Sequence, residues 1–292
     1  MGVTITPTMV GQVIVSGLLA GALYSMVALG LALIFGVMRV INIAHGTILM
    51  LGAYTTFWWF HLFQVNPYLS LLVSMPLMFL LGVVLQRTMV SRVVDAPELS
   101  SLLLTFGVSL AIVNLTQLAF SSDLRSVEYL TGAFLVGPFA LSKSRLISFV
   151  FAVSITLLAF WFLQKTKLGK AIRATSQSSE VAMVCGINVG RIHLYAFGIA
   201  SALAAAGGSL VAVMIAIQPE MGQVYTLKSF LVIVLGGAGN YPGALVGGML
   251  LGLVEQLSSL FLTTQLSEAV AYVLLVLVLL LRPTGLLGGR AR

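Results

Sequence analysis

Long apolar runs, separated by short polar segments, make up nearly the whole chain. Many of them are about 20 residues long, which is the length of helix that crosses the hydrocarbon core of a bilayer. Within the runs, apolar residues follow one another without the alternation that membrane β-barrel strands show. The pattern predicts helices at roughly 10–36, 47–63, 68–86, 99–119, 146–164, 193–217, 227–238, 243–262 and 268–281.

These runs predict an all-α, polytopic membrane protein with about eight to ten transmembrane helices, some of them broken or re-entrant. Composition agrees, because 59% of the 292 residues are hydrophobic, only 8% are charged and the mean hydropathy is +1.09. Soluble domains carry about 25% charged residues. No internal repeat or low-complexity segment divides the chain, so we expect a single domain over residues 1–292.

The net charge of +7 changes this picture little. Basic residues gather in the cytoplasmic loops of membrane proteins, so the excess indicates orientation and not a nucleic-acid partner. The single cysteine, Cys185, excludes an intrachain disulfide framework. The N-terminal segment lacks the basic region of a cleavable signal, and we expect no cleavage there.

Orientation follows from where lysine and arginine fall. The segment 165–192 is the most basic, and we expect it and the basic tail on the cytoplasmic side, with the N-terminus outside. The bases on which this rests are Lys165, Lys167, Lys170, Arg173, Arg191, Arg282, Arg290 and Arg292. Because segment 165–192 and the C-terminal tail are expected on the same side, the chain must cross the membrane an even number of times between them. The short run 227–238 must therefore count as a crossing. Its twelve residues reach only roughly 18 Å, which indicates a broken or tilted crossing.

Small residues four positions apart predict close helix packing, because they let helix backbones approach in a membrane. The pairs and stripes are Gly17 with Gly21, Gly243 with Gly247, Gly248 with Gly252, and Ala200 with Ala204 and Gly208. The alternative interpretation is that some of them line a pathway.

Two polar, glycine-containing stretches interrupt the apolar runs, "INIAHG" at 41–46 and "GGAGNYPG" at 236–243. We interpret both as helix breaks, and we expect the first near the cytoplasmic membrane face and Pro242 of the second in the first turn of the next helix, where its missing N–H costs nothing. Their polar groups either satisfy freed backbone groups or line a translocation path. With ionisable side chains nearly absent from the runs, we expect fixed backbone dipoles at these breaks to meet a polar solute. The candidate pathway residues are Asn42, His45, Gly46, Gly236, Gly237, Asn240, Pro242 and Gly243.

Catalytic patterns are missing from the sequence. No span holds a pair of carboxylates, and no HExxH, CxxC, G-x-S-x-G or Walker A motif occurs. We therefore expect no enzyme activity, no cofactor and no metal site in this chain. If transport consumes ATP, another chain hydrolyses it.

The cytoplasmic segment contains a short helix signature. Ser178 or Ser179 can cap its start, Glu180 sits in the first turn where the helix dipole favours an acid, and Gly186 can end it. A two-turn helix is marginal alone. It is either part of an ordinary solvated loop or the docking site of a partner.

Five stretches of the chain resemble the branched-chain amino acid permease family of ABC transporters. "INIAHG" resembles its I-N-F-A-H-G signature, and Glu180-Val181-Ala182 with Gly186 matches the E-A-A-x-x-x-G docking loop. "VLGGAGNYPGALVGGMLLGLVEQL" at 234–257 and "RPTGLLG" at 282–288 resemble two further family stretches, and "GINVGRI" resembles the segment after the docking helix. The likeness extends over nearly the whole chain, from about 17 to 288.

The resemblance implies a bacterial inner-membrane importer subunit that forms half of a translocation pathway. It also implies a second related permease subunit, two cytoplasmic ABC ATPase subunits, a periplasmic substrate-binding protein and surrounding membrane lipid. ATPase coupling would use Arg173, Glu180, Ala182, Gly186, Ile187 and Asn188. The implied substrates are branched-chain amino acids or related small amino acids, amides or carboxylates. Thr47, where the family commonly has Glu, and Val181, where it has Ala, are departures.

Two other classes remain as alternatives. A stand-alone secondary transporter or channel for a small polar solute would need ionisable residues at the membrane midplane, and Glu255 near a predicted helix end is the main exception to their absence. An intramembrane enzyme would need a catalytic set, which the sequence lacks.

Overall fold

A computed structural model describes residues 6–282 and 284–287, apart from the side chains of residues 136, 264 and 265. Arg290 and Arg292, two of the bases on which the predicted orientation rests, lie outside the described residues, as do the first five residues. Every apolar run predicted from the sequence forms a helix. The helices that these runs form are α1 (Pro7–Met38), α2 (His45–Phe63), α3 (Leu71–Thr88), α4 (Glu98–Phe120), α5 (Lys143–Lys165), α8 (Val189–Ala212), α9 (Met221–Gly236), α10 (Tyr241–Ser258) and α11 (Thr264–Leu281).

Short elements connect these helices. The 3₁₀ turns η1 (Pro67–Ser70) and η2 (Val90–Arg92) flank α3. Strands β1 (Ala133–Val136) and β2 (Phe139–Ser142) form an antiparallel hairpin before α5. Between α5 and α8 lie α6 (Lys167–Gln177) and α7 (Ser179–Val184).

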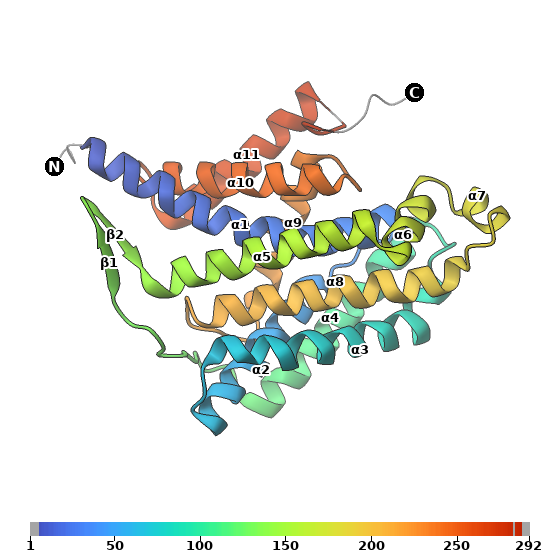
Figure 1. Cartoon of the computed structure of the whole chain (residues 1–292), viewed down its shortest axis with the longest axis horizontal. Coiled ribbons are helices and arrows are strands. Elements are labelled where there is room, and N and C mark those ends of the chain that lie inside the picture. Colours follow the sequence, from blue (N-terminus) through green and yellow to red (C-terminus); the bar gives the residue numbers. More distant parts are fainter. Residues whose placement is uncertain (1–5, 283, 288–292) are drawn as a thin grey trace.

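The long helices lie roughly side by side, as Figure 1 shows. Within the described residues, five helices are each long and apolar enough to span a membrane, and the bent pair α9–α10 forms either a broken sixth span or a re-entrant loop. The five are Pro7–Met38, Pro67–Arg92, Glu98–Phe120, Lys143–Lys165 and Val189–Ala212. The first is one continuous helix of 32 residues.

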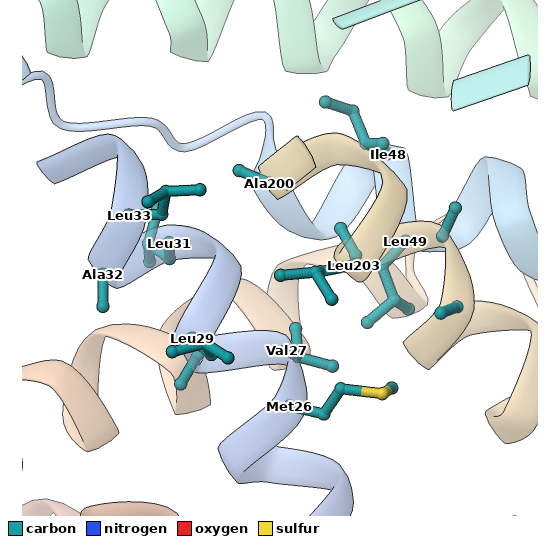
Figure 2. Packing of buried hydrophobic residues seen from close by; sticks show 14 of the residues in the cluster. Met26, Val27, Leu29, Leu31, Ala32, Leu33, Ile48, Leu49, Ala200 and Leu203 are labelled. Atoms are coloured by element: carbon teal, nitrogen blue, oxygen red, sulfur yellow. The ribbon is translucent and has the colours of Figure 1, made fainter. Parts of the chain in front are cut away.

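The core lies where α1, α2 and α8 meet, and Figure 2 shows part of it, including Met26, Leu49 and Leu203. Glycines bring the backbones of α2 and α8, and those of α1 and α10, close together, as the sequence predicted. A Cβ on Gly208 would collide with the Leu49 carbonyl oxygen of α2, and one on Gly248 would lie 2.5 Å from the Ser25 nitrogen of α1. This close approach excludes lipid and water from the centre of the bundle.

Leucines on the outer helices point away from the bundle. Leu72 of α3, Leu118 of α4 and Leu280 of α11 expose about three quarters or more of their surface (75%, 85% and 76%). Such a belt is stable only against lipid or against another apolar subunit.

The two ends of the bundle differ. The β1–β2 hairpin lies at one end beside the start of α1, where Gln12 Nε2 donates to the Ala140 carbonyl, and α6 and α7 lie at the other (Figure 1). The latter end carries the bases of segment 165–192. We call them the hairpin end and the α7 end.

Candidate functional site

The first helix break lies deep in the bundle. Arg39 ends α1 in the left-handed conformation (φ 53°). The chain then returns along α1, so that His45 Nε2 donates to the Val27 carbonyl at 2.9 Å. Val27 precedes the end of α1 by roughly 16 Å of helix. The break therefore begins at the end of α1 and reaches the interior of the bundle at His45, and its position near the cytoplasmic membrane face stays a prediction.

Gly46 seals the break against α9. Its N–H donates to Thr226 Oγ1 at 3.0 Å, and Thr226 Oγ1 also lies 3.2 Å from the Ile43 carbonyl. A Cβ at Gly46 would collide with the Gly222 carbonyl oxygen, so only glycine allows this approach. The N–H at the start of α2 is therefore satisfied by the protein itself.

Asn42 faces the interior of the bundle. It is completely buried, and neither amide atom has a hydrogen-bond partner in the structure. Its neighbours Ile41 and Ile43 instead line a groove of about 480 Å³ between α4 and α9. The nearby Thr47 Oγ1 is buried and lies 2.6 Å from Ser109 Oγ of α4.

The second break joins α9 to α10 at an angle of 117°. Gly237 and Gly239 adopt positive φ values of 100° and 75°, a region that glycine enters without strain. As predicted, Pro242 lies in the first turn of α10, where its missing N–H costs nothing. Contact between Gly236 and Gly243 closes the corner, because a Cβ on either would collide with the other's carbonyl oxygen.

The second break is also sealed by the chain. Asn240 Oδ1 accepts from the Gly243 N–H at 3.1 Å, and its Nδ2 donates to the Leu287 carbonyl at 2.6 Å. Leu286 N–H donates to the Leu235 carbonyl at 2.7 Å, which occupies an acceptor left free at the end of α9. Both ends of the Asn240 amide are thus used within the protein.

The two breaks do not form one site. The first contacts the beginning of α9 at Gly222, whereas the second follows its end at Gly236 and packs on Gly36 near the α7 end. Helix α9 therefore links the two groups of predicted pathway residues.

The predicted short helix is present as α7. Ser178 Oγ accepts from the Val181 N–H at 3.3 Å, and Glu180 lies in the first turn. After the helix, Gly186 N–H donates to the Met183 carbonyl at 2.9 Å and Ile187 N–H to the Ala182 carbonyl at 3.0 Å. These two bonds form a Schellman C-cap.

Gly186 is the left-handed residue of this cap (φ 81°), and an added Cβ there would have no atom within 4 Å. Asn188 Oδ1 then caps α8 by accepting from the Arg191 N–H at 3.0 Å. Arg173, on an exposed face of α6, donates to the Gln164 carbonyl at 3.4 Å. The predicted coupling residues therefore lie together at the α7 end.

One face of α7 is apolar and uncovered. Val181, Met183 and Val184 expose 62%, 55% and 90% of their surface, whereas Ala182 is buried against the rest of the chain. A cleft of about 860 Å³ separates α7 from the ends of α1 and α3. This geometry offers a small apolar projection to another molecule.

Sequence reasoning missed a buried charged cluster. Lys228 Nζ of α9 lies 2.7 Å from Glu255 Oε1 of α10 and 3.3 Å from Glu268 Oε1 of α11. It also donates to Tyr24 Oη of α1 at 3.1 Å. The expectation that the spans are nearly bare of ions is wrong here, because Lys228 and Glu255 expose only 9% and 8%.

A signal for this cluster was present in the sequence. Lys228 sits inside an apolar run, and Glu255 follows it after a glycine-rich turn, so a helical hairpin would pair them. In the described part of the chain, no three His, Cys, Asp or Glu side chains are placed to hold a metal ion.

Comparison with known proteins agrees with the motifs. Residues 13–279 match the family described as branched-chain amino acid transport system, permease component. The chain is 30% identical to the high-affinity branched-chain amino acid transport system permease protein LivH of Escherichia coli (strain K12), over 95% of each chain. It is 31% identical to the corresponding protein BraD of Pseudomonas aeruginosa, again over 95% of each.

A more distant likeness covers part of the chain. The ribose import permease protein RbsC of Escherichia coli (strain K12) is 32% identical over 36% of this chain and 36% of its own. No solved structure matches the chain.

Proposed function

The chain belongs to the branched-chain amino acid permease family, and on this premise we propose that it imports aliphatic amino acids as one half of an ABC-transporter pathway. It is a non-catalytic, multi-pass membrane subunit of a transporter complex. The relatives' names supply the substrate class of the proposal. Structurally, the observation that carries it is the uncovered apolar face of α7.

That face supports docking of ATPase subunits at the α7 end. A six-residue helix cannot hold its shape through its own hydrogen bonds, yet here two caps and the buried Ala182 fix it. Val184 is the most exposed of the three apolar side chains of α7, and a pocket on an ATPase would bury it. Two ATPase subunits, a second related permease and a periplasmic binding protein complete the proposed importer.

The proposed orientation places the α7 end in the cytoplasm and the start of α1 outside. The bases of segment 165–192 favour this side. Cys185 is exposed beside α7 and is the only cysteine of the sequence. An impermeant thiol reagent should label it in inside-out vesicles stripped of ATPase, and labelling of intact cells would reverse the orientation.

The test of function is binding-protein-dependent uptake of L-leucine by the reconstituted complex. Val184→Asp should lower uptake and ATPase association at least tenfold, because a charge would have to enter an apolar contact. The nearly isosteric Val184→Thr is the matched control and should retain most activity. Since the side chain is 90% exposed, neither variant should change the stability of the permease. Normal uptake by Val184→Asp would contradict docking at α7, and absence of uptake by the wild-type complex would contradict the proposed function.

A further inference from the structure

A cavity of about 410 Å³ lies toward the hairpin end, away from α7. Its wall includes the charged cluster of Lys228, Glu255 and Glu268 together with Arg145, at the start of α5. The volume is within the range of about 300–1,000 Å³ typical of small-molecule sites. Neither of the two helix breaks contributes to this wall.

The charges on the wall are not balanced within the cluster. Lys228 has three donors, and Tyr24, Glu255 and Glu268 surround it as three acceptors. The lysine is therefore fully used, while two carboxylates share its single positive charge. One net negative charge remains in a region where side chains are mostly buried.

Glu255 shows where the missing partner belongs. Its Oε1 accepts from Lys228, but its buried Oε2 has no hydrogen-bond partner in the structure. An unpaired carboxylate oxygen out of water is costly, and a donor that brings positive charge would relieve it. The second carboxylate, Glu268, is more exposed, with 36% of its side chain accessible.

The rest of the cavity wall includes aliphatic side chains and the guanidinium group of Arg145. Aliphatic side chains of α1, α8 and α9 cover much of it, including Leu23, Val211 and Val224. Arg145 is exposed and forms no ion pair with any side chain of the described residues. A negative pole, an apolar wall and a separate guanidinium thus share one cavity.

We propose that this cavity is a binding site for an aliphatic zwitterion, whose ammonium group is held by Glu255 and Glu268. The solute's carboxylate pairs with Arg145, and its aliphatic side chain lies against the apolar wall. Lys228 is a positioning residue, because it holds the two carboxylates together without a free donor for the solute. The assignment rests on the proposed function, and it locates the solute at side-chain ions and not at the helix breaks.

The experiment measures ligand binding to the purified complex in lipid nanodiscs, without binding protein, by saturation-transfer NMR. Three probes separate the poles: L-leucine, 3-methylbutylamine, which lacks the carboxylate, and 4-methylpentanoate, which lacks the ammonium. Leucine and the amine should bind in competition, and 4-methylpentanoate should bind at least tenfold more weakly than leucine.

Variants then test which side chains bind the ammonium group and which bind the carboxylate of the solute. Glu268→Gln, at the more exposed carboxylate, should weaken leucine and the amine at least tenfold. Arg145→Gln should weaken leucine but leave the amine unchanged, a split that a general loss of stability cannot produce. Glu255→Gln should weaken leucine and the amine like Glu268→Gln. Glu98→Gln, an exposed acid at the start of α4, is the matched control and should bind all probes normally.

The proposal is overturned if 4-methylpentanoate binds as tightly as leucine, or if Glu268→Gln leaves both amine-bearing probes unchanged. Leucine uptake by the wild-type complex with its binding protein distinguishes failure of the cavity site from failure of the proposed import function. If leucine is taken up but binding does not depend on the ammonium group, only the cavity site is rejected. If leucine is not taken up, the proposed import function is rejected.

Discussion

The second helix break and the charged cavity both gather polar groups among apolar helices, but they treat those groups differently. At the break, both ends of the Asn240 amide and the Leu235 carbonyl have hydrogen-bond partners within the chain, although the buried Tyr241 hydroxyl has none. In the cavity, Lys228 is saturated while Glu255 Oε2 remains without a partner.

This difference separates structural from binding roles. A polar group that the chain satisfies internally stabilises the fold and has nothing left for a solute. One that the chain leaves open, beside a cavity, has capacity for a ligand. The glycine-rich break, which attracts attention in the sequence, is therefore the less promising place for solute contact.

The largest expected effect follows from removing the centre of the cluster. Lys228→Met should destabilise the protein by about 3–5 kcal/mol, because the buried Glu255 and the partly exposed Glu268 would remain without their shared cation. Thermal unfolding in detergent measures this. Adding Glu255→Gln to Lys228→Met should restore part of the lost stability. If Lys228→Met alone were as stable as wild type, the ion pair would not stabilise the fold.

A smaller loss is expected from Gly236→Ala at the sealed break. Its Cβ would collide with the Gly243 carbonyl, and overpacking of this kind costs about 1–3 kcal/mol. Gly107→Ala of α4 is the matched control, since an added Cβ there meets nothing within 4 Å. The control should be neutral or slightly stabilising in the same unfolding assay. Equal stability of the two variants would mean that the corner is not closely packed.

Asn240→Ala should cost about 1 kcal/mol, the usual loss for an N-cap. Because both ends of the amide bond to the protein, the half-saturating leucine concentration for uptake should not change. Asn240→Asp keeps the acceptor for the Gly243 N–H and should recover most of the stability. A raised half-saturating concentration in Asn240→Ala would assign a solute contact to the break.

The smallest effect on stability is expected at the first break. Asn42→Leu removes a buried amide that has no partner, so stability should be equal to wild type or slightly higher.

Asn42→Ala and His45→Ala test the predicted pathway role of the first break. Both should lower the maximal rate of leucine uptake with little change in the half-saturating leucine concentration, because the binding protein is expected to set the affinity. A large rise in half-saturation at an unchanged maximal rate would show that these residues select the solute.

The sequence by itself determined the helices, the two breaks and the α7 segment. These depend on neighbouring residues: a run long enough to span lipid, Pro242 in a first turn, Ser178 and Gly186 at the two ends of one short helix. Local capping and the need of lipid for satisfied backbone groups leave few alternatives, so these predictions agree with the structure.

Only the tertiary structure decided the depth of the first break and the charged cavity. His45 reaches Val27 because α2 folds back along α1, and no local pattern states how far. The 117° turn between α9 and α10 brings Lys228 to Glu255, and α11 then adds Glu268. A single lysine in an apolar run says only that a partner is required. Which carboxylates provide it, and which oxygen stays open, depends on how distant helices pack.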